Sequence, residues 1–159
     1  MAAGAVLGVC LALEAVLRSG VPHPPGVFVP VHRFTLAWTH SIEKTRWEED
    51  YEVVPGPGGI ALLRPMQARI RGSGAGMEPP PDAVLHDGWY EYQPGTPPLH
   101  RLLLTRSGYT ADYDWCRRGA CRKLGALLPS DGGVTRLWPC RGMGSPDAEP
   151  ANGRIENRH

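Results

Sequence analysis

The stretch of residues 34–54, FTLAWTHSIEKTRWEEDYEVV, holds two runs of alternating apolar and polar residues around a polar centre. Side chains of an extended strand alternate between two faces, so Leu36 and Trp38 share one face, and Tyr51 and Val53 share another. These apolar faces match when the chain folds back on itself, with Trp38 across from Tyr51 and Leu36 across from Val53. The stretch therefore predicts an antiparallel β-hairpin with one face in the core.

This register places His40 across from Glu49 and Ser41 across from Glu48, with a loop over about residues 42–46. Neighbouring strand residues point to opposite faces, so His40 and Ser41 cannot act together as base and nucleophile. A core-facing pair of His40 and Glu49 is either a structural hydrogen bond or the floor of a pocket. The second possibility keeps open a small hydrolase or isomerase that uses His40 with a nearby carboxylate.

Turn residues punctuate the rest of the chain: 20 glycines and 17 prolines make up nearly a quarter of its 159 residues. Short runs of strand-forming residues lie between these turns, and Pro65 interrupts one of them, which indicates a bulge or an edge strand. We expect an all-β domain over residues 27–140, a small antiparallel barrel or sandwich of about 7–9 short strands. After the hairpin, the expected strands are 60–70, 88–92, 99–105, 109–116, 121–124 and 134–138.

The two ends of the chain differ from this middle part. Residues 2–13 form an unbroken apolar run, AAGAVLGVCLAL, which is too short to span a bilayer but has the length of a signal-peptide core. We predict a leader helix over residues 1–22, either a signal peptide or a membrane anchor, with a short buried helix as the alternative. The polar tail over residues 141–159 predicts disorder. A leader predicts export to the periplasm or cell envelope.

Charge and spacing exclude several kinds of site. The formal net charge of +1 gives no basic field for nucleic acid or for an anionic membrane. His32 and His40 lie eight residues apart, roughly 26 Å along a continuous strand, so they cannot share a metal ion. We predict no metal, no cofactor, no nucleic-acid partner, and membrane contact only through an uncleaved leader.

Cysteine spacing supports an oxidising compartment. Cys116 and Cys121 lie in DWCRRGACRKL, separated by four residues that include a glycine. Two strand ends joined by such a turn can bring their Cα atoms to disulfide distance. Two thiols alone would supply only half of a zinc site, which is the alternative. The role of Cys140 stays open: it is either buried and free or paired elsewhere.

The segment RGSGAGM, residues 71–77, alternates glycine with small residues. The three alternating glycines, Gly72, Gly74 and Gly76, free the backbone for positive φ angles, and backbone amides in such a loop, that of Ser73 included, can hold an anion. No Lys-Ser or Lys-Thr follows, so the segment is not a phosphate-binding P-loop. A plain surface loop is the alternative.

The strings FTLAWTHSIEKTRWEEDYEV and RGSGAGM, with DWCRRGACRKLGALLP after them, resemble a small bacterial family, the domain of unknown function 1850. The resemblance covers about residues 34–129. It departs at Arg46 and Trp47, where we expect proline and a small aliphatic residue. The resemblance implies a short exported or membrane-anchored protein, often encoded beside tripartite ATP-independent periplasmic transporters, and it implies no established activity.

The sequence thus favours a non-enzymatic exported binding or accessory module, associated with a periplasmic solute transporter, over the hydrolase or isomerase. A purely structural envelope protein is a third possibility. The expected partner is a transporter subunit or a small solute. If there is a binding site, the polar hairpin turn and the glycine segment should converge on it. The candidate binding residues are His40, Ser41, Glu43, Lys44, Thr45, Glu48, Glu49, Ser73, Gly74 and Gly76.

Overall fold

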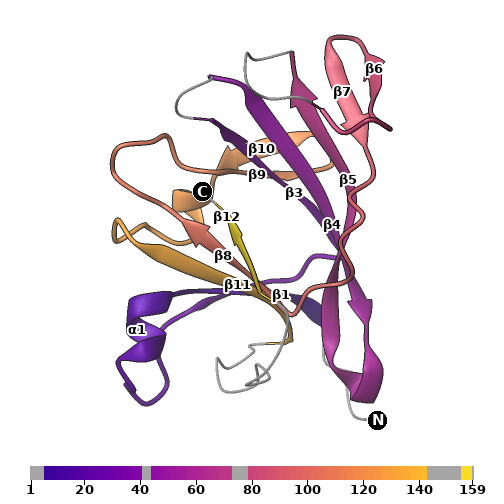
Figure 1. Ribbon diagram of the computed structural model, residues 1–159. Coiled ribbons are helices and arrows are strands. Elements are labelled where there is room, and N and C mark those ends of the chain that lie inside the picture. The colour runs from indigo at the N-terminus through magenta and orange to yellow at the C-terminus, as the bar shows by residue number, and fades with distance from the viewer. Residues whose placement is uncertain (1–5, 41–43, 73–78, 143–154, 159) are drawn as a thin grey trace.

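Two β-sheets pack face to face in the computed structural model, which describes residues 6–40, 44–72, 79–142 and 155–158 (Figure 1). All described strand pairs are antiparallel except the pair formed by the last strand with β8. The sheets do not close into a barrel, so the sandwich form of the predicted all-β fold is the one that fits. The first sheet has the order β12 (Ile155–Arg158), β8 (Arg101–Thr105), β11 (Val134–Arg141), β1 (Leu7–Leu13) and β2 (Val27–Val29). The second has the order β10 (Ala120–Lys123), β9 (Asp114–Arg117), β3 (Arg33–Thr39), β4 (Arg46–Pro55), β5 (Ala61–Arg71), β7 (Trp89–Tyr92) and β6 (Val84–His86).

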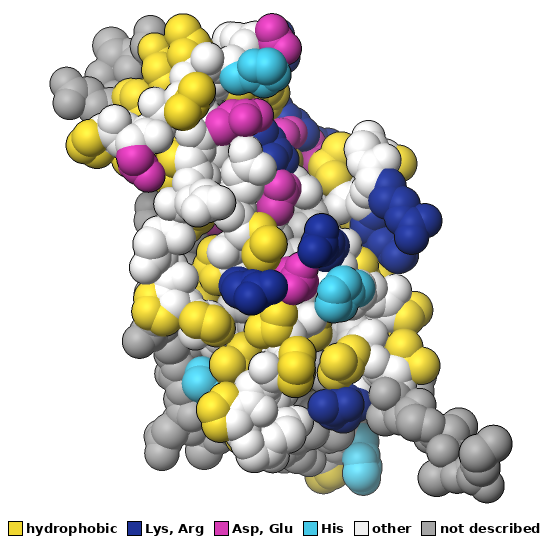
Figure 2. Space-filling model, turned by 90° about the vertical axis from the view of Figure 1, so that its right-hand side faces the viewer, with side chains coloured by type: hydrophobic (Ala, Val, Ile, Leu, Met, Phe, Trp, Pro, Cys, Tyr) yellow, Lys and Arg dark blue, Asp and Glu magenta, His cyan; other side chains and the backbone are white. Residues whose placement is uncertain are grey.

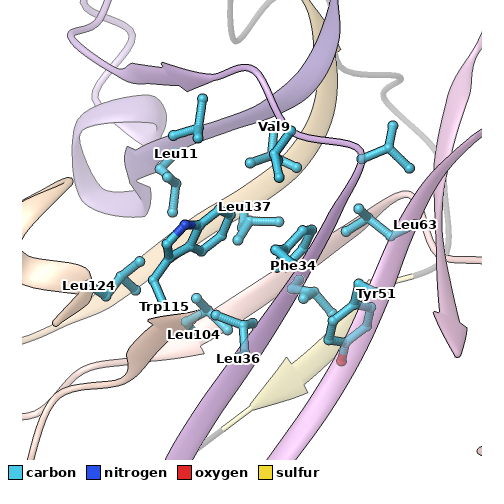
Figure 3. Packing of buried hydrophobic residues seen from close by; sticks show 14 of the residues in the cluster. Val9, Leu11, Phe34, Leu36, Tyr51, Leu63, Leu104, Trp115, Leu124 and Leu137 are labelled. Atoms are coloured by element: carbon cyan, nitrogen blue, oxygen red, sulfur yellow. The ribbon is translucent and has the colours of Figure 1, made fainter. Parts of the chain in front are cut away.

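Apolar side chains from both sheets fill the space between them (Figure 3). Trp115 of β9 is fully buried, and its ring stacks on Phe34 of β3 at 4.6 Å between centroids. Tyr51 of β4 stacks on the other side of this pair, 5.5 Å from Phe34. The first sheet contributes leucine and valine, including Leu11 and Leu137, so that aromatic rings of one layer pack against aliphatic groups of the other. The apolar residues of the alternating sequence pattern therefore lie on the inner faces of the two sheets.

The predicted hairpin forms, but its register was wrong. Leu36 lies across from Glu49, and Trp38 lies across from Trp47, a shift of four residues from the predicted pairing. The shift is even, so the same side chains still face the core. The turn is shorter than expected because the His40 backbone N–H donates to the Thr45 carbonyl at 2.8 Å. The rings of Trp38 and Trp47 stack with 6.1 Å between their centroids, so the observed register also pairs two aromatic residues across the hairpin.

Pro65 produces the predicted irregularity in β5. Asp50 pairs with Gln67, whereas the next residue of β4, Tyr51, pairs with Pro65, so Met66 has no partner across the ladder. A proline cannot donate a ladder hydrogen bond, and a bulge is one place where a sheet accepts one. The turn before β5, whose residues 55–59 read PGPGG, contains the one-turn 3-10 helix η1 (Pro57–Gly59).

The predicted leader helix is not confirmed. Its apolar run forms β1, which pairs with β11 over seven residues and with β2 on its other side. The side chains from Val9 to Ala12 are buried. A short apolar run can form either a buried strand or a buried helix. Here the neighbouring strands β11 and β2 are available to pair with it, and this pairing favours the strand. Only the short helix α1 (Glu14–Arg18) follows, and no helix in the described residues is long and apolar enough to cross a membrane.

A strand also forms within the tail that the composition predicts to be disordered. β12 pairs in parallel with β8 at the edge of the first sheet. Backbone groups make such a pairing, so a polar composition gives no signal for it. This strand covers residues 155–158, and the disorder expected for the tail as a whole stays a prediction.

Two disulfides link the described cysteines. The predicted Cys116–Cys121 bond is present and joins β9 to β10, where the two residues pair directly across the ladder. Cys140 pairs with Cys10 of β1, with 5.9 Å between their Cα atoms. The partner of Cys140 lay within the predicted leader, which explains why the sequence left that cysteine open. This second bond lies beside Trp138 in a small apolar cluster, separate from the main core, against which the α1 residue Leu17 packs.

Candidate functional site: a basic pocket on the outer face of the large sheet

The face of the seven-stranded sheet that points away from the core carries most of the ion pairs. Figure 2 shows acidic and basic side chains alternating down this outer face, with a separate basic group to one side. Arg46 of β4 bonds both Glu48 and Asp114, at 3.0 and 2.8 Å. Arg69 of β5 bonds Glu48 at 3.1 Å. The outer face is therefore a charged surface in which strands β9, β4 and β5 are cross-linked.

A pocket of about 670 Å³ opens on this face, and we call it the outer-face pocket. Its lining comes from the start of β3, the middle of β4, the bulge of β5 and the turn between β9 and β10. The side chains that matter below are Arg33, Thr35, Asp50, Arg69, Arg117 and Arg118.

Asp50 and Arg69 form a neutral pair within the lining. The Arg69 guanidinium donates two hydrogen bonds to the Asp50 carboxylate, at 2.8 and 2.9 Å. The Thr35 hydroxyl donates a third at 2.6 Å. The hydrogen bonds from Arg69 to Asp50 outweigh burial and hold the pKa of Arg69 above its usual range. Within this ion pair the opposite charges of Asp50 and Arg69 offset each other.

The turn between β9 and β10 supplies two further arginines. Arg117 pairs with Ala120, so Arg118 and Gly119 are the two central residues of the hairpin turn. Their φ angles, +50° and +81°, are both positive, as a type I′ turn requires, and glycine adopts such an angle without strain. Arg117 and Arg118 are exposed, and no hydrogen bond or ion pair reaches either guanidinium from the described residues.

Arg33 lies at the same end of the sheet. Thr35 pairs with Cys116, and continuing this antiparallel register toward the turn brings the start of β3 beside the tip of the β9–β10 hairpin. Arg33 bonds Glu52 at 2.8 Å, yet 70% of its side chain is exposed to solvent. Its guanidinium has further N–H groups beyond those used by Glu52.

The candidate residues of the hairpin are spread over two faces of the sheet. Glu48 lies on the outer face, bonded to Arg46 and Arg69. Glu49 faces the interior, is 8% exposed and accepts a hydrogen bond from the Tyr51 hydroxyl. Because Leu36 lies across from Glu49, the predicted pairing of Glu49 with His40 was wrong.

The turn residues hold the hairpin closed. The His40 carbonyl accepts a hydrogen bond from the Lys44 N–H at 2.9 Å, and Lys44 has a φ of +55°. Thr45 is buried. None of His40, Lys44, Thr45, Glu48 and Glu49 lines the outer-face pocket.

The remaining candidates, Ser41, Glu43, Ser73, Gly74 and Gly76, lie outside the described residues. Their described flanks are close in the topology. β3 ends at Thr39, β4 begins at Arg46 and β5 ends at Arg71, so the strand ends that flank the two segments lie at one end of the sheet. That the two segments form one site stays a prediction.

Sequence reasoning missed the outer-face pocket. The motif DWCRRGACRKL carries Arg117 and Arg118 beside the cysteines and the glycine that predict the disulfide. Two adjacent arginines at the turn of a predicted hairpin were the available signal. Nothing in the sequence brings that turn to Arg33, because the β3–β9 pairing joins segments about 80 residues apart.

Comparison with known proteins identifies a family and no function. The family model described as domain of unknown function (DUF1850) matches residues 34–124, and the chain belongs to this family. The match runs from β3 to the short 3-10 helix η2 (Leu124–Ala126), and so includes almost all of the seven-stranded sheet. Searches of curated proteins and of solved structures found no match.

Proposed function

We propose that this member of the DUF1850 family is a non-enzymatic binding module whose site is the outer-face pocket. The observation that supports this proposal is the pocket itself. Its volume of about 670 Å³ lies within the range of small-molecule sites. Three paired strands, β3, β4 and β5, and a disulfide-linked hairpin form most of its lining, so the site is largely preformed.

The chemistry of the lining favours binding over catalysis. Arginine stays protonated in proteins and cannot serve as a general base. Asp50 already accepts hydrogen bonds from Arg69 and Thr35. His32 also lines the pocket, but no described carboxylate is hydrogen-bonded to it. General acid–base catalysis needs a proton-transferring pair aimed at a substrate, and this lining offers mainly fixed positive charge.

Export to the periplasm or cell envelope is the second part of the proposal. Two disulfides are compatible with an oxidising compartment, where such bonds form and persist. We place β1 within the exported, folded domain, because it is buried in the sandwich and bonded to Cys140.

The third part is an association with a solute transporter, which rests on the family resemblance. A module that holds a solute beside a periplasmic transporter would fit a small, rigid, preformed pocket. The test is a thermal-shift screen of the purified chain against small metabolites, with capture of transporter subunits from host membranes by the tagged chain. We expect a stabilising solute and recovery of a subunit. A screen without any stabilising solute would refute the pocket as a binding site, and recovery of no subunit would refute the association.

A further inference from the structure

We propose that the ligand of the outer-face pocket is a small organic anion, a carboxylate or a phosphate ester, held by Arg117 and Arg118. This inference rests on the proposed binding function and names the chemical class of the ligand. It starts from the charges of the lining. Arg69 and Asp50 cancel one another, whereas Arg117 and Arg118 have no described anionic partner.

The two free guanidinium groups belong to a fixed element of the fold. Arg118 occupies the first central position of a two-residue turn, which is among the tightest hairpin connections. The Cys116–Cys121 disulfide and an ion pair between Asp114 and Lys123, at 2.9 Å, hold the two strands of the hairpin together. The turn can therefore present its charges with little further ordering on binding.

The chemistry of arginine selects the ligand class. A guanidinium donates parallel hydrogen bonds that match the oxygens of a carboxylate or phosphate, and such charge-assisted bonds are stronger than neutral ones. Arg33, on the lining at the same end of the sheet, can offer N–H groups that Glu52 does not use. Cys116 and Met66 also line the pocket and provide less polar surface for a carbon skeleton.

The pocket dimensions and the charge of the chain favour a small solute over a polyanion. About 670 Å³ suits a single small molecule. The net charge of the whole chain is +1, so the chain as a whole has no strong positive field that would attract a nucleic acid or an anionic membrane. An acidic segment of a partner protein is the competing occupant, and a small-molecule binding assay separates it from a solute.

The test is isothermal titration calorimetry on the full chain at constant ionic strength. The probes are citrate, glycerol 3-phosphate and inorganic phosphate, with neutral trimethyl citrate as the uncharged counterpart. We expect at least one anion to bind, and trimethyl citrate to bind at least about tenfold more weakly than citrate if citrate is that anion. The relative affinities of citrate and the two phosphates decide which oxyanion the pocket prefers.

The variant that tests the arginines is Arg117→Gln combined with Arg118→Asn. Asparagine before Gly119 is a preferred type I′ sequence, so this variant removes two charges while keeping the turn. The charge-matched control is Arg122→Gln with Arg141→Gln. Neither control residue lines the pocket, whereas Arg117 and Arg118 both do.

We expect the turn variant to lose at least about tenfold in anion affinity and the control to stay within about twofold of the wild type. Equal affinity of the turn variant and the wild type would overturn the inference, as would failure of all three anions to bind. If trimethyl citrate or another uncharged solute binds while the anions do not, the anion class is wrong and the proposed binding function stands. Circular dichroism of both variants checks that each one is folded.

Discussion

The position of β1 in the core leads to a sharp prediction about Leu11. Its side chain is fully buried between the two sheets, among the residues that surround Trp115 (Figure 3). Replacing a buried leucine by alanine removes its packing contacts and leaves a cavity, which costs about 2–5 kcal/mol. A domain is stable by about 5–15 kcal/mol in total, so Leu11→Ala should leave a folded but clearly weakened protein. For a domain of this size the melting temperature should fall by about 4–20 °C.

Urea unfolding at pH 7, followed by tryptophan fluorescence, measures this change. The matched control is Val6→Ala, because Val6 stands just before β1 and is 58% exposed. A substitution at such an exposed position should change the free energy of unfolding by no more than about 0.5 kcal/mol. Both variants keep the Cys10–Cys140 bond, so the comparison isolates packing.

The result that would refute this reasoning is an unchanged unfolding midpoint for Leu11→Ala. The first strand would then contribute nothing to the folded domain, as expected for a cleaved leader. The intact mass of the exported protein gives a second measurement, because we expect residues 7–13 to be retained in it.

Two further predictions concern the disulfides and the acid response. Replacing both cysteines of the Cys10–Cys140 bond by serine should lower the free energy of unfolding by about 5 kcal/mol, against about 2 kcal/mol for the Cys116–Cys121 bond, as measured by urea unfolding. The difference arises because the two bonds close loops of 130 and 5 residues. Equal losses would contradict the loop-entropy account. Burial alone would raise the pKa of Glu14, but hydrogen bonds from two arginines lower it below its usual value. The folded carboxylate resists protonation more than the unfolded one, so its contribution is present above about pH 4.3 and is lost as the pH falls below that value. Glu14→Gln should therefore show a shallower loss of stability on acidification, measured by unfolding at a series of pH values, and an unchanged slope would exclude this ion pair as a cause.

The stretch around the first hairpin shows how far local sequence reaches. Alternation of apolar residues placed Leu36 and Tyr51 on the core side, and the structure confirms both. The register was wrong by four residues because alternation repeats every two residues and does not distinguish even shifts. The turn decides among them, and its closure between His40 and Thr45 depends on backbone geometry that composition does not reveal.

The candidate site was harder to predict for a different reason. Sequence motifs draw attention to residues that lie close together along the chain, such as Glu48 and Glu49. A strand sends such neighbours to opposite faces, and these two have separate partners in the structure. The pocket instead combines Arg33 with Arg118 through the pairing of β3 with β9.

By itself the sequence determined the properties that depend on near neighbours: the β class, the face of the hairpin that is buried, an irregularity at Pro65 and the Cys116–Cys121 bond. Each depends on side-chain alternation or turn chemistry within a few residues. Only the tertiary structure decided that the apolar N-terminal run is a strand, that Cys10 is the partner of Cys140, and that the basic turn borders a pocket. These outcomes depend on which distant strands pair, and backbone pairing leaves little trace in the composition of either partner.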